Sequence, residues 1–185
     1  MFELGGHPMV LRANELQLTR GESVRDTALV FSRHVGAIGG RRLAYVGDGN
    51  NVARSLAILG ALAGVEVAVA APEGFQLEDS LGARLTSDPA EAVAGADAVY
   101  TDVWVSMSDA DEQAAARREA LAPYRLDEAL LDRAAPHAFA LHCLPAHPGE
   151  EITEGVLYGD RQRIWDQAEN RRHVFKALLE FLVAG

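Results

Sequence analysis

The fold is decided by residues 43–51, LAYVGDGNN, in which an apolar run leads into a turn with two glycines. The apolar run predicts a buried strand over Leu43–Gly47, and the turn predicts a helix start near Asn51, with the helix running to Ala63. A second apolar run, Val65–Ala71, predicts another strand. Strands that alternate with helices form parallel sheets with right-handed crossovers, so we expect an α/β protein with a Rossmann-like parallel sheet flanked by helices.

The alternation of strands and helices continues to the end of the chain. Further strands are predicted over Ala98–Asp102 and Phe139–Cys143, with a short one over Arg163–Trp165. A long helix with an apolar core stripe is predicted over Glu169–Val183. The other helices start at capping residues: Asp88, with Pro89 and Glu91 completing a capping box, then Ser108 or Asp109, and Asp127.

A break in the chain separates this alternating part from an N-terminal part. An amphipathic helix is predicted from Ser23 to Gly36. Glycines and charged residues follow it at positions 38–42, which is typical of a junction between segments. We therefore expect two segments, residues 1–40 and residues 41–185.

Composition and charge exclude several classes of protein. The 185 residues include 17 basic and 27 acidic side chains, and the net charge of -10 argues against nucleic acid or an anionic membrane as the main partner. The apolar stretches are too short to span a bilayer, and the N-terminus does not resemble a signal peptide. A single cysteine, Cys143, excludes an intramolecular disulfide and a Cys-rich zinc site. We expect a cytoplasmic protein.

Polar and reactive residues follow the predicted strands at their carboxyl ends, where ligands bind in open parallel sheets. The helix start at Asn50 or Asn51 favours an anion such as a carboxylate. A dinucleotide fingerprint would have a third glycine at Val52, so only Glu73, further along the chain, favours NAD. A glycine turn with an asparagine cap is equally expected without any ligand.

Asp102 ends a predicted buried strand and precedes the apolar loop 103–107. An uncompensated carboxylate is costly in such surroundings, so a cationic group is expected to face it. An aspartate at a strand end is otherwise a turn or cap residue, and that interpretation stays open.

Cys143 lies at the end of another predicted strand, next to His142. Successive strand residues point to opposite faces, so His142 is not expected to be the base for its neighbour. A zinc site with His142, Cys143 and His147 has no usual ligand spacing. A lone cysteine is most often a buried apolar residue, but its place at a strand end makes Cys143 a candidate for chemistry.

The last helix opens with a charged run that ends in Arg171. Such a run is usually solvated surface. Arg171 is nevertheless a candidate to turn inward to a phosphate or carboxylate.

Taken together, these motifs resemble those of the ornithine carbamoyltransferases, which pass the carbamoyl group of carbamoyl phosphate to the side-chain amine of ornithine. The matching motifs stand in family order: Val46-Gly47-Asp48-Gly49-Asn50-Asn51-Val52, Asp102-Val103-Trp104 with Ser106-Met107, His142-Cys143-Leu144-Pro145 and Ala168-Glu169-Asn170-Arg171. The front of the chain resembles the later part of the family's carbamoyl phosphate domain, at Leu4-Gly5-Gly6-His7-Pro8 and Asp26-Thr27-Ala28.

The chain also departs from the family pattern. Family members have a Ser-Thr-Arg-Thr helix start that grips the phosphate, and this sequence has none. Between Ile38 and Arg41 the family has a long stretch with a phosphate-binding arginine and a His-Pro-x-Gln motif, which is also missing here. By resemblance, residues 1–40 are a remnant of the carbamoyl phosphate domain, and residues 41–185 are the ornithine domain.

The resemblance implies a role for each site residue. Four residues would hold ornithine: Asn51, Asp102, Ser106 and Met107, with Asp102 facing the α-ammonium and the amides near Asn51 and Met107 facing the carboxylate. Cys143 would assist deprotonation of the attacking amine, Leu144 would offer its backbone to the carbamoyl group, and Arg171 would stabilise the developing oxyanion or phosphate.

The resemblance therefore implies a carbamoyltransferase that needs no cofactor or metal and is impaired because phosphate-binding motifs are missing. Carbamoyl phosphate binding is expected to be weak or absent. Two alternatives stay open, a non-catalytic amino-acid-binding protein and an NAD-dependent oxidoreductase. The family is trimeric through the carbamoyl phosphate domain, so this chain is expected to form a weak or irregular homo-oligomer.

Overall fold

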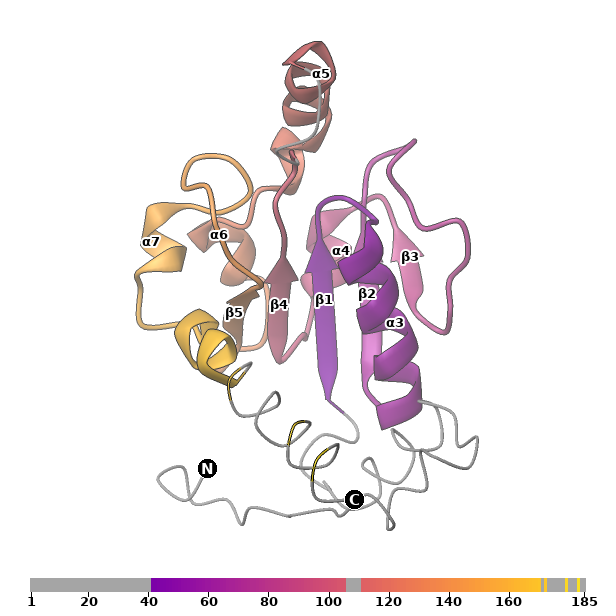
Figure 1. The fold of residues 1–185 in the computed structure, drawn as a ribbon, viewed down its shortest axis with the longest axis vertical. Helices are drawn as coiled ribbons and strands as arrows, with labels where there is room; N and C mark the ends of the chain where they lie inside the picture. Colours follow the sequence, from indigo (N-terminus) through magenta and orange to yellow (C-terminus); the bar gives the residue numbers. More distant parts are fainter. Residues whose placement is uncertain (1–40, 106–110, 171, 173–178, 180–182, 184–185) are drawn as a thin grey trace.

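The computed structural model describes residues 41–105, 111–170, 172, 179 and 183. These residues form a parallel sheet with helices on both faces (Figure 1). The predicted helix over residues 23–36 and the predicted cap at Ser108 or Asp109 lie outside the described residues.

The sheet has five parallel strands in the order β3-β2-β1-β4-β5. Their bounds are β1 Arg42–Val46, β2 Glu66–Ala70, β3 Arg84–Thr86, β4 Ala98–Thr101 and β5 Phe139–His142. The chain runs outward from β1 to β2 and β3, and then returns to the other side of β1 with β4 and β5. The strand order therefore reverses between β1 and β4, and ligands of such sheets bind at the carboxyl end of this switch point.

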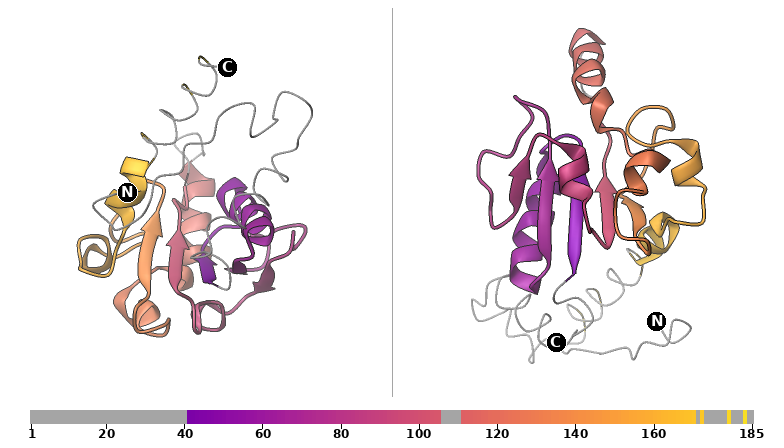
Figure 2. Two further views of the ribbon diagram at one scale, coloured as in Figure 1. Left: turned by 90° about the horizontal axis from the view of Figure 1, so that it is seen from below. Right: turned by 180° about the vertical axis from the view of Figure 1, so that it is seen from behind.

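Helices cover the two faces unequally. On one face α3, Asn51–Ala63, packs through Ala53, Ala57 and Gly60. On the other face lie α4, Pro89–Val93, and α6, Glu128–Leu131, with α7, Glu154–Leu157, next to α6 (Figure 2). α5, Asp111–Leu121, projects from the carboxyl edge of the sheet and leads into a 3-10 turn, Ala122–Tyr124.

The predicted elements around the glycine turn are confirmed. The helix α3 has the predicted bounds, because the Asn50 side chain caps its first turn and Gly64, with φ of 72°, ends it. Asp88 and Asp127 cap α4 and α6 as expected.

Two local predictions are wrong, and one strand was missed. The edge strand β3 was not expected, because three residues are too short to show an alternating pattern. Arg163–Trp165 is not a strand: Gln162 forms one isolated bridge with Ala140, and residues 164–170 are helical. The Glu91 carboxylate does not complete a capping box, because it accepts hydrogen bonds from Arg84 and Thr86 instead.

Candidate functional site

The candidate site lies at the carboxyl ends of β1, β4 and β5, on the side of the sheet where the strand order reverses. Asn50 follows β1, Asp102 follows β4 and Cys143 follows β5. Although they are far apart in the sequence, their side chains are joined by hydrogen bonds. The parallel register brings them together, because Thr101 of β4 pairs with His142 of β5 and Tyr45 of β1 pairs with Tyr100 of β4.

Asp102 is the centre of this group, with only 6% of its surface exposed. Its Oδ1 accepts hydrogen bonds from the Cys143 thiol at 2.6 Å and from the Val103 N–H at 2.8 Å. Its Oδ2 accepts one from the Asn50 side-chain amide at 2.9 Å. None of these donors carries a positive charge, and within the described part of the chain no ion pair reaches Asp102. The cation expected from the sequence is therefore not supplied by these residues.

The Cys143 thiol is held in its neutral form. Burial raises its pKa, and the hydrogen bond to Asp102 and the charge of that carboxylate raise it further, to about 12. The cysteine as a residue is nevertheless exposed, so it links the buried Asp102 carboxylate to the protein surface. A thiol with this pKa is a weak nucleophile at neutral pH, but its conjugate base would be a strong base.

The turn after Cys143 has an unusual backbone. Leu144 has φ of 58°, in the left-handed region that side chains with a Cβ rarely adopt, and a cis peptide bond joins it to Pro145. The Leu144 N–H donates to His142 Nδ1 at 2.8 Å. This contact holds the strained residue in place.

A buried pair lies beneath this turn. His142 and Glu151 are both fully buried, and His142 Nε2 lies 3.2 Å from Glu151 Oε1. Since Nδ1 of His142 accepts a hydrogen bond from the Leu144 N–H, the ring proton lies on Nε2, which donates a hydrogen bond to Glu151. Glu151 Oε1 also accepts from the His147 N–H at 2.6 Å. Both ring nitrogens of His142 are thus engaged, which fits the prediction that it is not the base for Cys143.

Asn51, predicted to hold the ligand carboxylate, lies exposed at the first position of α3. The side-chain oxygen of its neighbour Asn50 accepts hydrogen bonds from the N–H groups of Val52 and Ala53. The cap therefore uses two of the backbone donors that an anion at this helix start would use.

The structure explains both glycines of the turn without a bound nucleotide. Gly47 has φ of 133°, which favours glycine. A Cβ on Gly49 would lie 2.5 Å from the Phe75 carbonyl oxygen, and the Gly49 N–H donates to that oxygen at 2.7 Å. The lack of a side chain at Gly49 therefore allows the loop at Phe75 to approach closely, and it gives no support for NAD binding.

Arg117 of α5 connects three loops around the site. Its guanidinium pairs with Asp48, donates to the Trp104 carbonyl at 2.8 Å and lies over the Phe75 ring at 5.1 Å. It thereby fixes the loops that follow β1, β2 and β4 relative to one another. Trp104 itself is buried, and a Cβ on Gly47 would lie 3.6 Å from its indole nitrogen.

Sequence reasoning gave Asn50 only a possible place at the helix start, as a cap or beside an anion, and gave no role to Arg117 or Glu151. Asn50 stands inside the glycine motif, so the neighbouring residues indicated that it lies at a turn before a helix. Arg117 and Glu151 lie among other charged residues and resemble solvated surface, so no local signal distinguishes them. Three predicted site residues, Ser106, Met107 and Arg171, lie outside the described residues.

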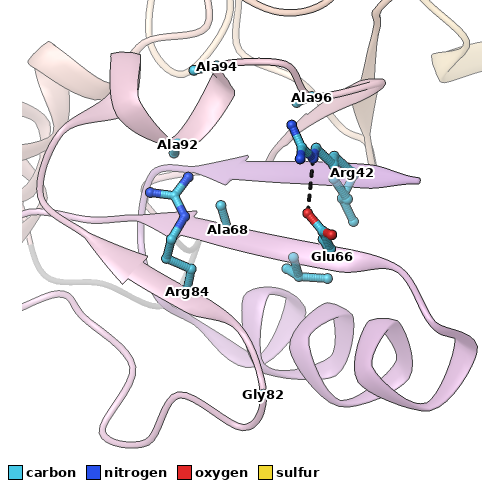
Figure 3. A pocket seen from close by; sticks show the side chains of 10 residues that line it. Arg42, Glu66, Ala68, Gly82, Arg84, Ala92, Ala94 and Ala96 are labelled. Atoms are coloured by element: carbon cyan, nitrogen blue, oxygen red, sulfur yellow. Dashed lines mark hydrogen bonds and ion pairs between the residues drawn. The ribbon is translucent and has the colours of Figure 1, made fainter. Parts of the chain in front are cut away.

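A cavity of about 410 Å³ lies away from these residues, near the amino ends of β1 and β2 (Figure 3). Its charged side chains are already paired: Arg42 donates to Glu66 at 2.9 Å, and Arg84 donates to Glu91 at 2.5 Å. This cavity therefore offers less to a charged ligand than the edge around Asp102. Among the described residues, no three His, Cys, Asp or Glu side chains are grouped to hold a metal ion. Nor does this part of the chain contain a helix long and apolar enough to cross a membrane.

Comparison with known proteins identifies relatives over the whole chain. An ornithine carbamoyltransferase of Methanoculleus marisnigri is 40% identical over 242 residues, covering 100% of this chain and 78% of its own length. One from Acidothermus cellulolyticus is 43% identical, covering 98% of this chain and 77% of its own. Because the matched stretch is longer than the 185 residues here, these relatives contain residues within it that this chain lacks.

Solved structures agree with this relationship. The ornithine carbamoyltransferase of Pyrococcus furiosus superposes with a TM-score of 0.74 and 36% identity, over 100% of this chain and 78% of that one. The enzyme of Gloeobacter violaceus gives a TM-score of 0.71 and 42% identity, over 85% of this chain and 57% of that one. The family model described as "Aspartate/ornithine carbamoyltransferase, Asp/Orn binding domain" matches residues 39–182. The chain therefore belongs to the aspartate/ornithine carbamoyltransferase family.

Proposed function

We propose that this chain binds L-ornithine at the carboxyl ends of β1, β4 and β5, with the α-ammonium of the amino acid against the Asp102 carboxylate. The buried position of Asp102 carries this proposal, because its three described donors are all uncharged. A buried carboxylate is most stable when a cation compensates it, and an ammonium group is such a cation. The amides near the exposed Asn51 and near Met107 are proposed to face the carboxylate of ornithine, and Ser106 is proposed as a further contact of the amino acid.

Cys143 is proposed to assist the attack of the ornithine side-chain amine on carbamoyl phosphate. In this reaction the amine nitrogen bonds to the carbamoyl carbon, the bond from that carbon to the phosphate oxygen breaks, and the amine loses a proton. The negative charge of Asp102 helps to hold the thiol in its neutral form. An ammonium against Asp102 would offset that charge and lower the pKa of the thiol, so that substrate binding prepares Cys143 as a base.

Two further groups would act on the carbamoyl phosphate. The backbone at Leu144 is proposed to contact the carbamoyl group, and its left-handed conformation, held by His142, is consistent with a specialised role. Arg171 is proposed to stabilise the oxyanion or the leaving phosphate.

The division of the chain at residue 40 leads to a second part of the proposal. We infer that residues 41–185 are an ornithine domain and that residues 1–40 are a remnant of a carbamoyl phosphate domain. The family model for the Asp/Orn binding domain matches residues 39–182, which supports this division. Without the His-Pro-x-Gln motif, the leaving phosphate loses part of its electrostatic stabilisation, so transfer by this polypeptide is proposed to be impaired.

Citrulline formation from ornithine and carbamoyl phosphate tests the activity. We expect turnover far below the roughly 10 s⁻¹ of an ordinary enzyme, together with measurable ornithine binding. Turnover within about a hundredfold of that value would show that the missing motifs are not needed here. Ornithine binding without any turnover would favour the alternative of an amino-acid-binding protein.

A further inference from the structure

Asn50 joins the start of α3 to the Asp102 carboxylate. Its side-chain oxygen accepts from the Val52 N–H at 2.9 Å and from the Ala53 N–H at 3.2 Å. Its side-chain nitrogen donates to Asp102 Oδ2 at 2.9 Å. One residue therefore caps the helix and contacts the centre of the candidate site.

The orientation of the Asn50 amide is determined by its surroundings. Tyr45, buried below the turn, donates its hydroxyl to the same amide oxygen at 3.3 Å. Burial raises the pKa of Tyr45 well above its ordinary value, so this hydroxyl keeps its proton. With three donors at the oxygen, only the nitrogen can point at Asp102, because a flipped amide would place its N–H groups against N–H and O–H donors.

The Asn50 contact also limits how the Asp102 carboxylate can turn. Oδ1 is occupied by Val103 and Cys143, and Oδ2 by Asn50. Donors on both oxygens fix the plane of the carboxylate. The lone pairs that remain free therefore point in a fixed direction, from which a ligand ammonium can approach. Loss of the Asn50 donor would leave Oδ2 without its only described partner in a buried place.

We propose that Asn50 is a positioning residue for ornithine, which acts through Asp102 by holding its carboxylate in the orientation that receives the ammonium. This inference rests on the proposed function. Asn50 is assigned no direct contact with the amino acid. Its side-chain oxygen already accepts hydrogen bonds from the helix start and from Tyr45, and its side-chain nitrogen donates to Asp102.

Two substitutions separate positioning from helix capping. Serine is as good an N-cap as asparagine, whereas alanine at this position removes the cap and destabilises the helix start, and neither side chain is long enough to reach Asp102. Asn50→Ser and Asn50→Ala should therefore differ in stability yet weaken ornithine binding by the same factor, about three- to tenfold. The matched control is Asp88→Ala, which removes the cap of α4 and should leave ornithine affinity unchanged.

A double-mutant cycle shows whether Asn50 acts through Asp102. Ornithine affinity is measured by calorimetry for the unmutated chain, Asn50→Ser, Asp102→Asn and the double variant. We expect Asn50→Ser to change affinity less than about twofold when residue 102 is asparagine, because contacting residues are not additive. An equal loss in both backgrounds, or no loss in either, would overturn the proposal.

Urea unfolding of the same four proteins provides a readout without ligand. We expect the two single variants to shift the midpoint by amounts that do not add in the double variant. Additive shifts would contradict the link between Asn50 and Asp102. If the unmutated chain does not bind ornithine, the proposed function fails, and the urea cycle still decides whether Asn50 acts on Asp102.

Discussion

The thiol of Cys143 donates a hydrogen bond to Asp102 Oδ1 across 2.6 Å, from the end of β5 to the end of β4. The two residues are 41 positions apart in the sequence, and the parallel pairing of their strands brings them together. This bond gives the site a protonated sulfur next to an uncompensated carboxylate.

Cys143 should react slowly with an alkylating reagent at neutral pH. Its pKa is raised from 9.0 to about 12, first by burial and then by Asp102, so the thiolate fraction rises only toward the upper end of the accessible pH range. In Asp102→Asn the charge is removed, and the reaction should begin at lower pH. The measurement is the rate of alkylation of Cys143 as a function of pH, with the modified protein quantified by mass spectrometry. Identical profiles for the two proteins would show that Asp102 does not control the thiol.

Gly49→Ala should destabilise the protein. The new Cβ would lie 2.5 Å from the Phe75 carbonyl oxygen and 2.8 Å from the Leu77 nitrogen, and both are backbone atoms that cannot turn away. We expect a loss of roughly 1–3 kcal/mol in the free energy of unfolding, as for other overpacked sites. Gly74→Ala is the control, because it adds a Cβ with no atom within 4 Å, at a left-handed φ of 84°. A larger loss in Gly74→Ala would contradict the close approach at Gly49.

Asp97 should stabilise the fold above about pH 4 and lose this effect in strong acid. Its pKa is lowered from 3.8 to about 2, first by the Arg42 N–H and then by His137, so folding favours the ionised form. Stability from this group is complete above the unfolded pKa and disappears as the pH falls through about 2. Asp97→Asn should therefore lower the urea midpoint at pH 6 and have a much smaller effect at pH 2.

The control for Asp97 is Glu66→Gln. Glu66 pairs with Arg42 at 2.9 Å, but its side chain is 70% exposed, and exposed ion pairs contribute little. We expect its urea midpoint to stay close to that of the unmutated chain. Equal losses in Asp97→Asn and Glu66→Gln would show that the position of Asp97 between β1 and β4 has no special importance.

Much of the fold could be predicted because local signals agree with the tertiary structure. The apolar run before Gly47, the cap at Asn50 and the glycine at position 64 define β1 and α3 without help from distant residues. The strand β3 could not be predicted in this way, since its three residues depend on pairing with β2.

The site was predictable in part. Asp102 and Cys143 stand at strand ends, where ligands bind in parallel sheets, so their position made them candidates and predicted that they lie close together. Glu151 gives no such signal. It looks like an exposed acid beside Glu150, yet it is fully buried, and its Oε1 accepts hydrogen bonds from His142 and from the His147 N–H.

Calorimetric titration of ornithine into the unmutated chain and into Asp102→Asn tests the central claim most directly. If Asp102 compensates the α-ammonium, the loss of this charge-assisted contact should weaken binding about ten- to a hundredfold, corresponding to roughly 1.5–3 kcal/mol. Cys143→Ser is the control, because serine keeps the size of the side chain and the thiol is assigned to the reacting amine; it should affect ornithine binding less. Equal ornithine affinity in the unmutated and Asp102→Asn proteins would contradict the account.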